Sequence, residues 1–170
     1  VQLYKMASNF EKVVNFNVQY GVIQSSELVP KSNIIEKDPI TVERCMRLIR
    51  EEMRELEDSI KDNDFVEMID ALSDILYVVY GMGARVGIDM DKAFALVHDN
   101  NMRKLCKTEE EAQRSVEDYE KRKDVTGYTS PTYRQAPDGI HWVVYNKSDN
   151  KVLKSIEHQK VMLEELCKCV

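Results

Sequence analysis

Acidic side chains are concentrated in two short stretches of the chain, and their spacing within each stretch repeats as on one side of a helix. They are Glu51, Glu52 and Glu55, followed by Glu67, Asp70 and Asp74. Carboxylates gathered in one place repel one another unless protons or cations neutralise them. Mg²⁺ prefers oxygen ligands and leaves coordination positions open for substrate phosphates. The two stretches therefore raise the hypothesis of a magnesium site that binds a phosphorylated substrate.

Both acidic stretches lie in segments with the pattern of long α-helices. Asp38 and Pro39 are typical of an N-cap followed by the first helical turn, and a single apolar stripe then continues to about Asp62. Residues 64–85 are apolar over most of a helical circumference, which predicts a central helix. The run Asp62-Asn63-Asp64 predicts the turn and the N-cap between the two helices.

Folding this helix pair about Asn63 would bring the acids to one face. At about 100° per residue, Glu52 falls within the apolar stripe of the first helix, and the hairpin register puts it opposite Asp74. Glu55 and Glu67 lie nearer the bend. Five or six carboxylates would then face a common volume between two largely apolar helices.

The simplest alternative is a solvated acidic stripe neutralised by neighbouring arginines, and the spacing alone leaves both interpretations open. A di-iron carboxylate site is excluded, because it requires Glu-x-x-His pairs and none of the three histidines follows a glutamate by three positions. The turn between the helices also lacks the glycine and the terminal glutamate of a calcium-binding EF-hand loop.

The remaining segments predict an all-α helical bundle built on a long antiparallel helix hairpin, with a small C-terminal β-hairpin insertion. We expect one domain covering residues 6–170. Its parts would be a catalytic helical core over about 8–105, a charged helix and β-hairpin extension over about 107–154, and a closing helix over about 155–168.

The composition excludes several classes of protein. A length of 170 residues fits one domain, and a formal charge of −6 argues against a protein that binds duplex nucleic acid through phosphate contacts. No apolar stretch reaches the roughly 18 residues of a membrane span, and no signal-peptide pattern opens the chain. The four cysteines form no CxxC pair, so we expect a reducing, cytoplasmic compartment.

Three segments in order resemble the MazG-like and phosphoribosyl-ATP pyrophosphohydrolase-like superfamily. REEMREL at 50–56 is similar to its EExxE motif, and VEMIDALSDILYVVYG at 66–81 is similar to its ExxD segment. GIDMDKAFALVHDNNMRK at 87–104 is similar to the following helix of the family. The resemblance covers roughly residues 8–105 and is strongest to the dimeric all-α dUTPase-like branch.

The resemblance implies roles for individual residues. The metal ligands for Mg²⁺, with Mn²⁺ as a substitute, would be Glu51, Glu52, Glu55, Glu67 and Asp70. Glu52 would also orient or deprotonate the attacking water. Asn101 and Lys104 match the NxxK positions and would contact the phosphates or sugar of the substrate. Asp74 would support the ligands or the helix.

The implied activity is hydrolysis of a nucleoside triphosphate to a monophosphate and pyrophosphate. The expected partner is a small nucleotide with a dUTP-like or dCTP-like base, bound by a homodimer or homotetramer. Phosphoribosyl-ATP hydrolysis is one alternative, and a non-enzymatic helical interaction domain is another. The chain departs from the family pattern at Arg103, where serine is common, and in the insertion over 107–150.

Overall fold

The computed structural model describes residues 6–168, which are mostly helical and carry one small antiparallel sheet. The expected helical class is thereby confirmed. The described residues divide into two compact units, one formed by 6–94 with 163–168 and the other by 95–162. Residues 1–5 and 169–170, including Cys169, lie outside the description. Within 6–168, no helix combines the length and apolarity needed to cross a membrane.

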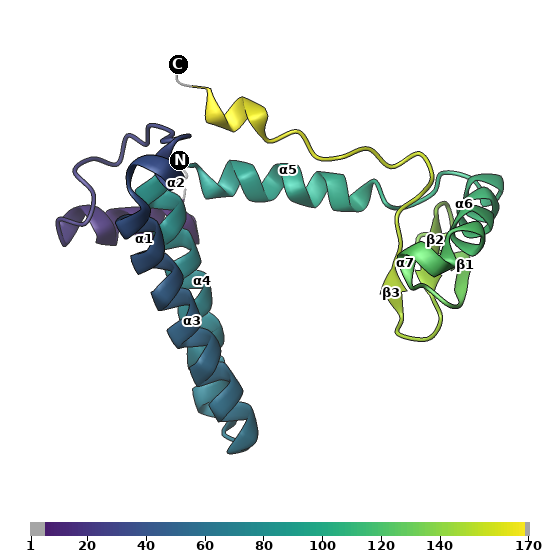
Figure 1. Cartoon of the computed structure of the whole chain (residues 1–170), viewed down its shortest axis with the longest axis horizontal. Coiled ribbons are helices and arrows are strands. Elements are labelled where there is room, and N and C mark those ends of the chain that lie inside the picture. Colours follow the sequence, from purple (N-terminus) through teal and green to yellow (C-terminus); the bar gives the residue numbers. More distant parts are fainter. Residues whose placement is uncertain (1–5, 169–170) are drawn as a thin grey trace, which may run out of the picture. The chain divides into compact units, whose positions relative to one another are not determined.

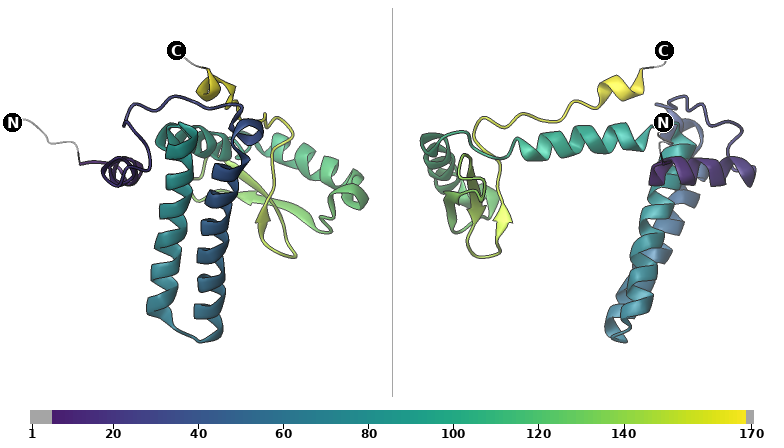
Figure 2. Two further views of the ribbon diagram at one scale, coloured as in Figure 1. Left: turned by 60° about the vertical axis from the view of Figure 1, so that its left-hand side comes forward. Right: turned by 180° about the vertical axis from the view of Figure 1, so that it is seen from behind.

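The first unit is built on a pair of long helices, α3 (Pro39–Lys61) and α4 (Phe65–Val86), which run side by side (Figures 1 and 2). Asp38 caps α3, since its carboxylate accepts a hydrogen bond from the Thr41 backbone N–H at 3.0 Å. Asp64 caps α4 in the same way, accepting from the first turn of that helix. These are the caps that the sequence predicted.

Helix α1 (Asn9–Gln19) packs against the second half of α4. The rings of Phe10 and Tyr80 lie 5.8 Å apart, and Phe10 and Val14 form a buried cluster with Ala84. The core of this unit therefore lies at the C-terminal end of α4. The hairpin tip has no comparable cover within the unit.

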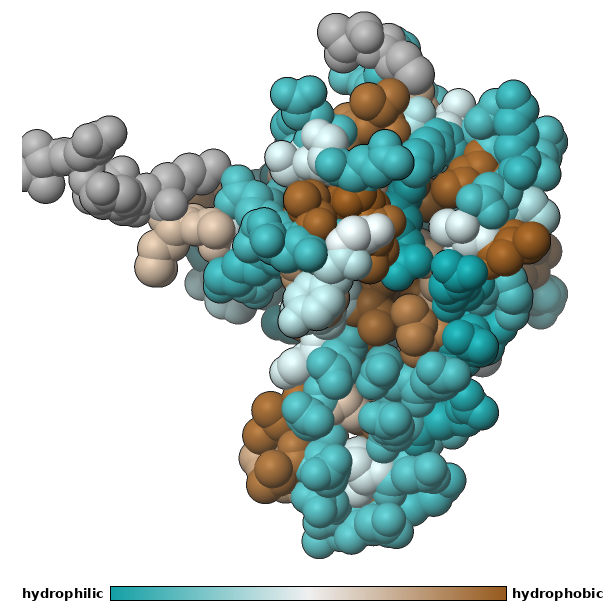
Figure 3. All heavy atoms as spheres, turned by 90° about the vertical axis from the view of Figure 1, so that its left-hand side faces the viewer, coloured by the Kyte–Doolittle hydropathy of each residue, from teal (hydrophilic) through white to brown (hydrophobic). Residues whose placement is uncertain are grey.

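One side of α4 remains exposed, which differs from the central position predicted for it. A stripe at i, i+4, i+7 and i+11 has substantial solvent exposure, at 68%, 49%, 46% and 57% in order. Its members are Phe65, Ile69, Leu72 and Leu76. Hydrophobic residues accordingly reach the surface along the hairpin in the lower part of Figure 3. Because α3 and α1 cover only part of α4, a long apolar stripe is left without a partner in one copy of the chain.

The connection from α1 to α3 returns across the end of α4 and contains the short helix α2 (Ile34–Lys37). Its path is fixed where the Lys31 backbone N–H donates to the Val86 carbonyl at 2.9 Å. Gly87 ends α4 in the left-handed region with φ 77°, and a Cβ there would lie 1.8 Å from the Val29 carbonyl oxygen. Only glycine permits both this backbone conformation and this close approach.

We expect Gly87→Ala to lower the free energy of unfolding by more than about 2 kcal/mol, because a strained φ is added to a backbone clash. Gly21→Ala is the matched control, since Gly21 also has a positive φ of 67° but a Cβ added there would meet no atom within 4 Å. Urea denaturation of both variants measures the difference. Equal losses in the two variants would contradict the role given to the Val29 contact.

The second unit contains the end of α5 (Met90–Met102) and a helix-covered sheet (Figure 1). Its other elements are α6 (Glu109–Lys121), α7 (Lys123–Thr126), β1 (Pro131–Gln135), β2 (Trp142–Asn146) and β3 (Lys151–Val152). The strands are antiparallel in the order β1-β2-β3, so the region predicted to contain a β-hairpin holds three strands rather than two. Cys106, Val144 and Leu153 lie in the buried core between α6 and the sheet.

The closing helix predicted for 155–168 is wrong. Only the 3₁₀ turn η1 (Glu164–Cys167) is present there, and 153–163 is irregular. The beginning of the segment is instead held against α6 through its backbone N–H groups. The Lys154 N–H donates to the Tyr119 hydroxyl at 3.2 Å, and the Ile156 N–H donates to the Ser115 hydroxyl at 2.9 Å. These bonds hold the chain against α6 and away from helical geometry.

Candidate metal and nucleotide site

The acidic residues of the hairpin gather around Glu52, in the middle of α3. Glu51 and Glu52 are half-buried, whereas Glu55, Asp70 and Asp74 are exposed. Cys45 and Ser59 are buried on the same stripe of α3 as Glu52, so that stripe is the one that faces α4. The Glu52 side chain therefore starts from the inner side of the hairpin.

Glu52 has the most unusual environment of the group. Its Oε2 atom is buried and has no hydrogen-bond partner. Burial raises the pKa of the Glu52 carboxyl above its ordinary value, and neighbouring negative charges raise it further. Those neighbours, in order of decreasing effect, are Glu55, Asp74, Glu51 and Asp70. An unpartnered carboxylate oxygen surrounded by four other carboxylates is an unfavourable arrangement that a cation would relieve.

The structure therefore brings five of the six predicted acids into electrostatic contact. Asp74 affects Glu52 more strongly than Asp70 does, as expected from the hairpin register, which puts Asp74 opposite Glu52. Glu67 is exposed in the first turn of α4 and is not among the four carboxylates that raise the Glu52 pKa. Glu51 also lies 3.7 Å from Arg47, one turn earlier on the exposed side of α3.

The residues present fit a hard divalent cation by their chemistry. Among residues 6–168, no three His, Cys, Asp or Glu side chains are already close enough to form a ligand group. The donors around Glu52 are nevertheless all carboxylate oxygens, the type that Mg²⁺ prefers. The buried Oε2 atom of Glu52 has no hydrogen-bond partner and is therefore free to serve as a metal ligand.

The two predicted substrate-binding residues belong to the second unit. Asn101 is exposed in the last turn of α5, and Lys104 is half-buried just beyond it. The Lys104 backbone N–H donates to the Asn101 carbonyl at 3.1 Å, so the two are held within one turn. That these two residues contact the phosphates or sugar of a substrate remains a prediction.

Comparison with known proteins agrees with this geometry. Residues 25–101 match the phosphoribosyl-ATP pyrophosphohydrolase family. That family belongs to the MazG-like all-α NTP pyrophosphohydrolase superfamily, and the match suggests a nucleotide pyrophosphohydrolase activity. The match contains both acidic stretches, as well as Asn101. The chain is also similar to an uncharacterized protein of Acanthamoeba polyphaga mimivirus, with 27% identity over 234 aligned positions covering 88% of this chain and 91% of that protein.

Proposed function

We propose that this protein hydrolyses a nucleoside or deoxynucleoside triphosphate to the monophosphate and pyrophosphate, with Mg²⁺ as its cofactor. The observation that carries the proposal is the buried, partnerless Glu52 oxygen amid four carboxylates, inside the segment that matches a pyrophosphohydrolase family. Mg²⁺ bound to this cluster would neutralise its carboxylates, so that the phosphates of an anionic substrate could approach them.

The residues that would hold the metal are those of the acidic cluster on α3 and α4. They are Glu51, Glu52, Glu55 and Asp70, with Glu67 at the near end of α4 and Asp74 supporting or joining them. Mg²⁺ held there would supply neutralisation of phosphate charge, which favours attack at phosphorus. The chain itself would position the nucleophile, because Glu52 can accept a hydrogen bond from a water and hold it in line. Asn101 and Lys104 would bind the phosphates or the sugar.

The favoured substrates are dUTP-like or dCTP-like nucleotides, because the segments at 66–81 and 87–104 are most similar to the dUTPase-like branch. Phosphoribosyl-ATP is the second candidate, and the family matched over residues 25–101 favours it. Hydrolysis of either substrate breaks the bond between the α and β phosphates, so Glu52 would have the same role with both.

We expect pyrophosphate as the first product from the preferred nucleotide, and no turnover after exhaustive chelation. A panel of nucleotides including phosphoribosyl-ATP, assayed with Mg²⁺ in ¹⁸O-labelled water, identifies the substrate and the attacked phosphorus by mass spectrometry. Mn²⁺ should restore activity to the chelated protein. Diphosphate and orthophosphate as the first products, or full activity in excess chelator, would refute the mechanism.

We further propose that the working form is a homodimer or homotetramer in the cytoplasm. The exposed stripe on α4 is longer than the scattered apolar residues usual on a monomer surface. A second copy supplies an identical stripe, and self-complementary contacts of this kind are the commonest in soluble oligomers. We propose neither a membrane nor duplex nucleic acid as a partner.

A further inference from the structure

A second charged region of the first unit lies apart from the acidic cluster. It is a cavity of about 300 Å³ between the returning loop, the beginning of α3 and the end of α4. Four cationic side chains line it: Lys31, Lys37, Arg44 and Arg85. In a chain with a formal charge of −6, this concentration of positive charge in one hollow is unusual.

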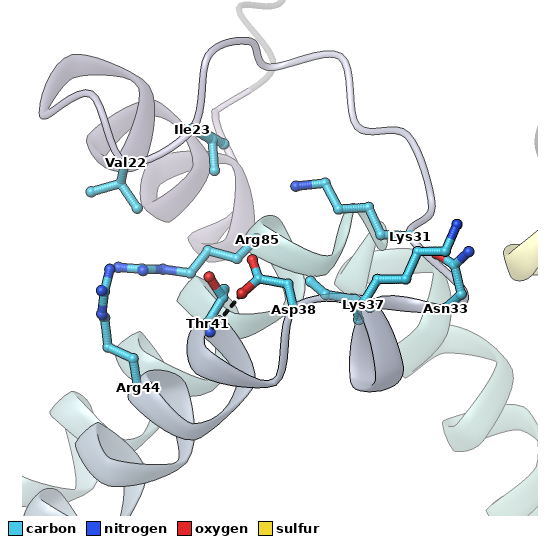
Figure 4. A pocket seen from close by; sticks show the side chains of 10 residues that line it. Val22, Ile23, Lys31, Asn33, Lys37, Asp38, Thr41, Arg44 and Arg85 are labelled. Carbon is cyan, nitrogen blue, oxygen red and sulfur yellow. Dashed lines mark hydrogen bonds between the residues drawn. The ribbon is translucent and has the colours of Figure 1, made fainter.

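The four cations are held by different segments that the fold brings together. Lys31 is anchored by the backbone bond to Val86, whose neighbour Arg85 is in the last turn of α4. Arg44 comes from the second turn of α3, and Lys37 from α2. In Figure 4, Arg44 and Arg85 extend to the same side of Asp38, while Lys31 and Lys37 lie on the other side.

The charged groups of these four side chains have no anionic partner at close range. Among the ion pairs within 4.0 Å in residues 6–168, none involves any of the four, and their ammonium and guanidinium groups donate none of the hydrogen bonds found there. Asp38 is the single acid in the lining. Hydrogen bonds from Thr41, with which its carboxylate caps α3, lower its pKa, and the charges of Arg44 and Lys31 lower it further. The cavity therefore keeps an excess of positive charge, and Arg85 is half-buried there.

The cavity and the acidic cluster share no lining residue. Arg44 precedes Glu52 by eight positions on α3, which corresponds to about 12 Å along the helix axis. The acidic cluster repels a metal-free phosphate, whereas the cavity attracts one without any metal. Phosphate binding measured in the presence of a chelator therefore reports on the cavity and not on the acidic cluster.

We propose that this cavity is a binding site for a small anion bearing one or two phosphoryl groups, held directly by Arg44, Arg85, Lys31 and Lys37. Guanidinium groups bind phosphate oxygens through paired hydrogen bonds, and the lysines add charge without fixed geometry. Inorganic phosphate, pyrophosphate and the phosphate of a nucleoside monophosphate all carry this chemistry. The site goes beyond the proposed hydrolysis, because it requires neither Mg²⁺ nor Glu52.

The test is calorimetric titration of the full chain with pyrophosphate, inorganic phosphate and dUMP, in excess EDTA at about 0.1 M ionic strength. We expect pyrophosphate to bind with a Kd below about 1 mM and more tightly than phosphate. If dUMP binds more tightly than inorganic phosphate, the ligand is a nucleotide. If the two bind equally tightly, the ligand is a free phosphate. Glu52→Gln should leave these affinities unchanged even if it abolishes turnover, so the two proposals can fail separately.

Substitutions that remove a positive or a negative charge from the lining should change the affinity for pyrophosphate in opposite directions. Arg44→Gln and Arg85→Gln should each weaken pyrophosphate binding on the order of tenfold. Asp38→Asn should tighten it several-fold, because asparagine keeps the cap of α3 while a repelling charge is lost. Arg54→Gln is the control, with the same charge change about 15 Å further along α3 than Arg44. Absence of pyrophosphate binding, or equal affinities in Arg44→Gln, Arg85→Gln and Arg54→Gln, would overturn the proposal.

Discussion

Glu52→Gln should lower turnover by a factor on the order of 10²–10⁴ while the protein keeps its fold. Glutamine has the same shape as glutamate but binds a divalent cation weakly and cannot accept a proton from water. The buried Oε2 atom of Glu52 has no other partner, so no structural hydrogen bond is lost with the charge. The loss should therefore be one of chemistry and metal binding. Steady-state rates with Mg²⁺ measure the first, and calorimetric Mg²⁺ titration measures the second.

The same substitution should raise the thermal stability of the metal-free protein. Glu52 is repelled by Glu55, Asp74, Glu51 and Asp70, and removal of one charge relieves all four interactions. Glu57→Gln is a matched control, because Glu57 is an exposed residue of α3 and is not among the carboxylates with the largest effects on the Glu52 pKa. Unfolding curves in EDTA should rise for Glu52→Gln relative to Glu57→Gln. Near-normal turnover by Glu52→Gln would instead move the water-positioning role to another acid.

Much of the first unit could be predicted because its signals are local. Asp38, Asp64 and Gly87 define helix ends through hydrogen bonds or backbone angles that involve only neighbouring residues. Once those ends are known, the hairpin register follows, and it correctly puts Asp74 within range of Glu52. The register does not predict the surroundings of Glu67. This residue lies in the first turn of α4, next to the bend, and its side chain is exposed.

The remaining features depend on contacts between distant segments. The segment that begins at Lys154 has a helical composition, but hydrogen bonds from its backbone to hydroxyl groups of α6 hold it against that helix. The basic cavity joins Lys31 to Arg85 across more than fifty positions through one backbone hydrogen bond at Val86. Neither pairing has a periodic signature in the sequence, because each depends on where a loop crosses a helix. Such sites emerge only with tertiary structure.

The apolar stripe on α4 leads to the second large expected effect: Leu76→Asp should convert an associated protein into a monomer. Leu76 is 57% exposed in one copy, so an aspartate there is solvated in the monomer and should change its stability little. In an interface between two copies the same aspartate would be buried without a partner. A two-fold interface contains the substitution twice, which doubles the penalty.

We expect Leu76→Asp to weaken association at least a hundredfold, corresponding to about 2.8 kcal/mol at 1.4 kcal/mol per factor of ten. Leu76→Met is the matched control, because it keeps an apolar side chain of similar volume and should remain associated. Sedimentation equilibrium over a wide concentration range gives the association constants of both variants and the wild type. Circular dichroism establishes that Leu76→Asp is folded.

A wild-type protein that stays monomeric at high concentration would show that the stripe is not an interface between copies. Association of Leu76→Asp would place the interface elsewhere. Loss of association only in the aspartate variant identifies α4 as the surface through which copies of this chain meet.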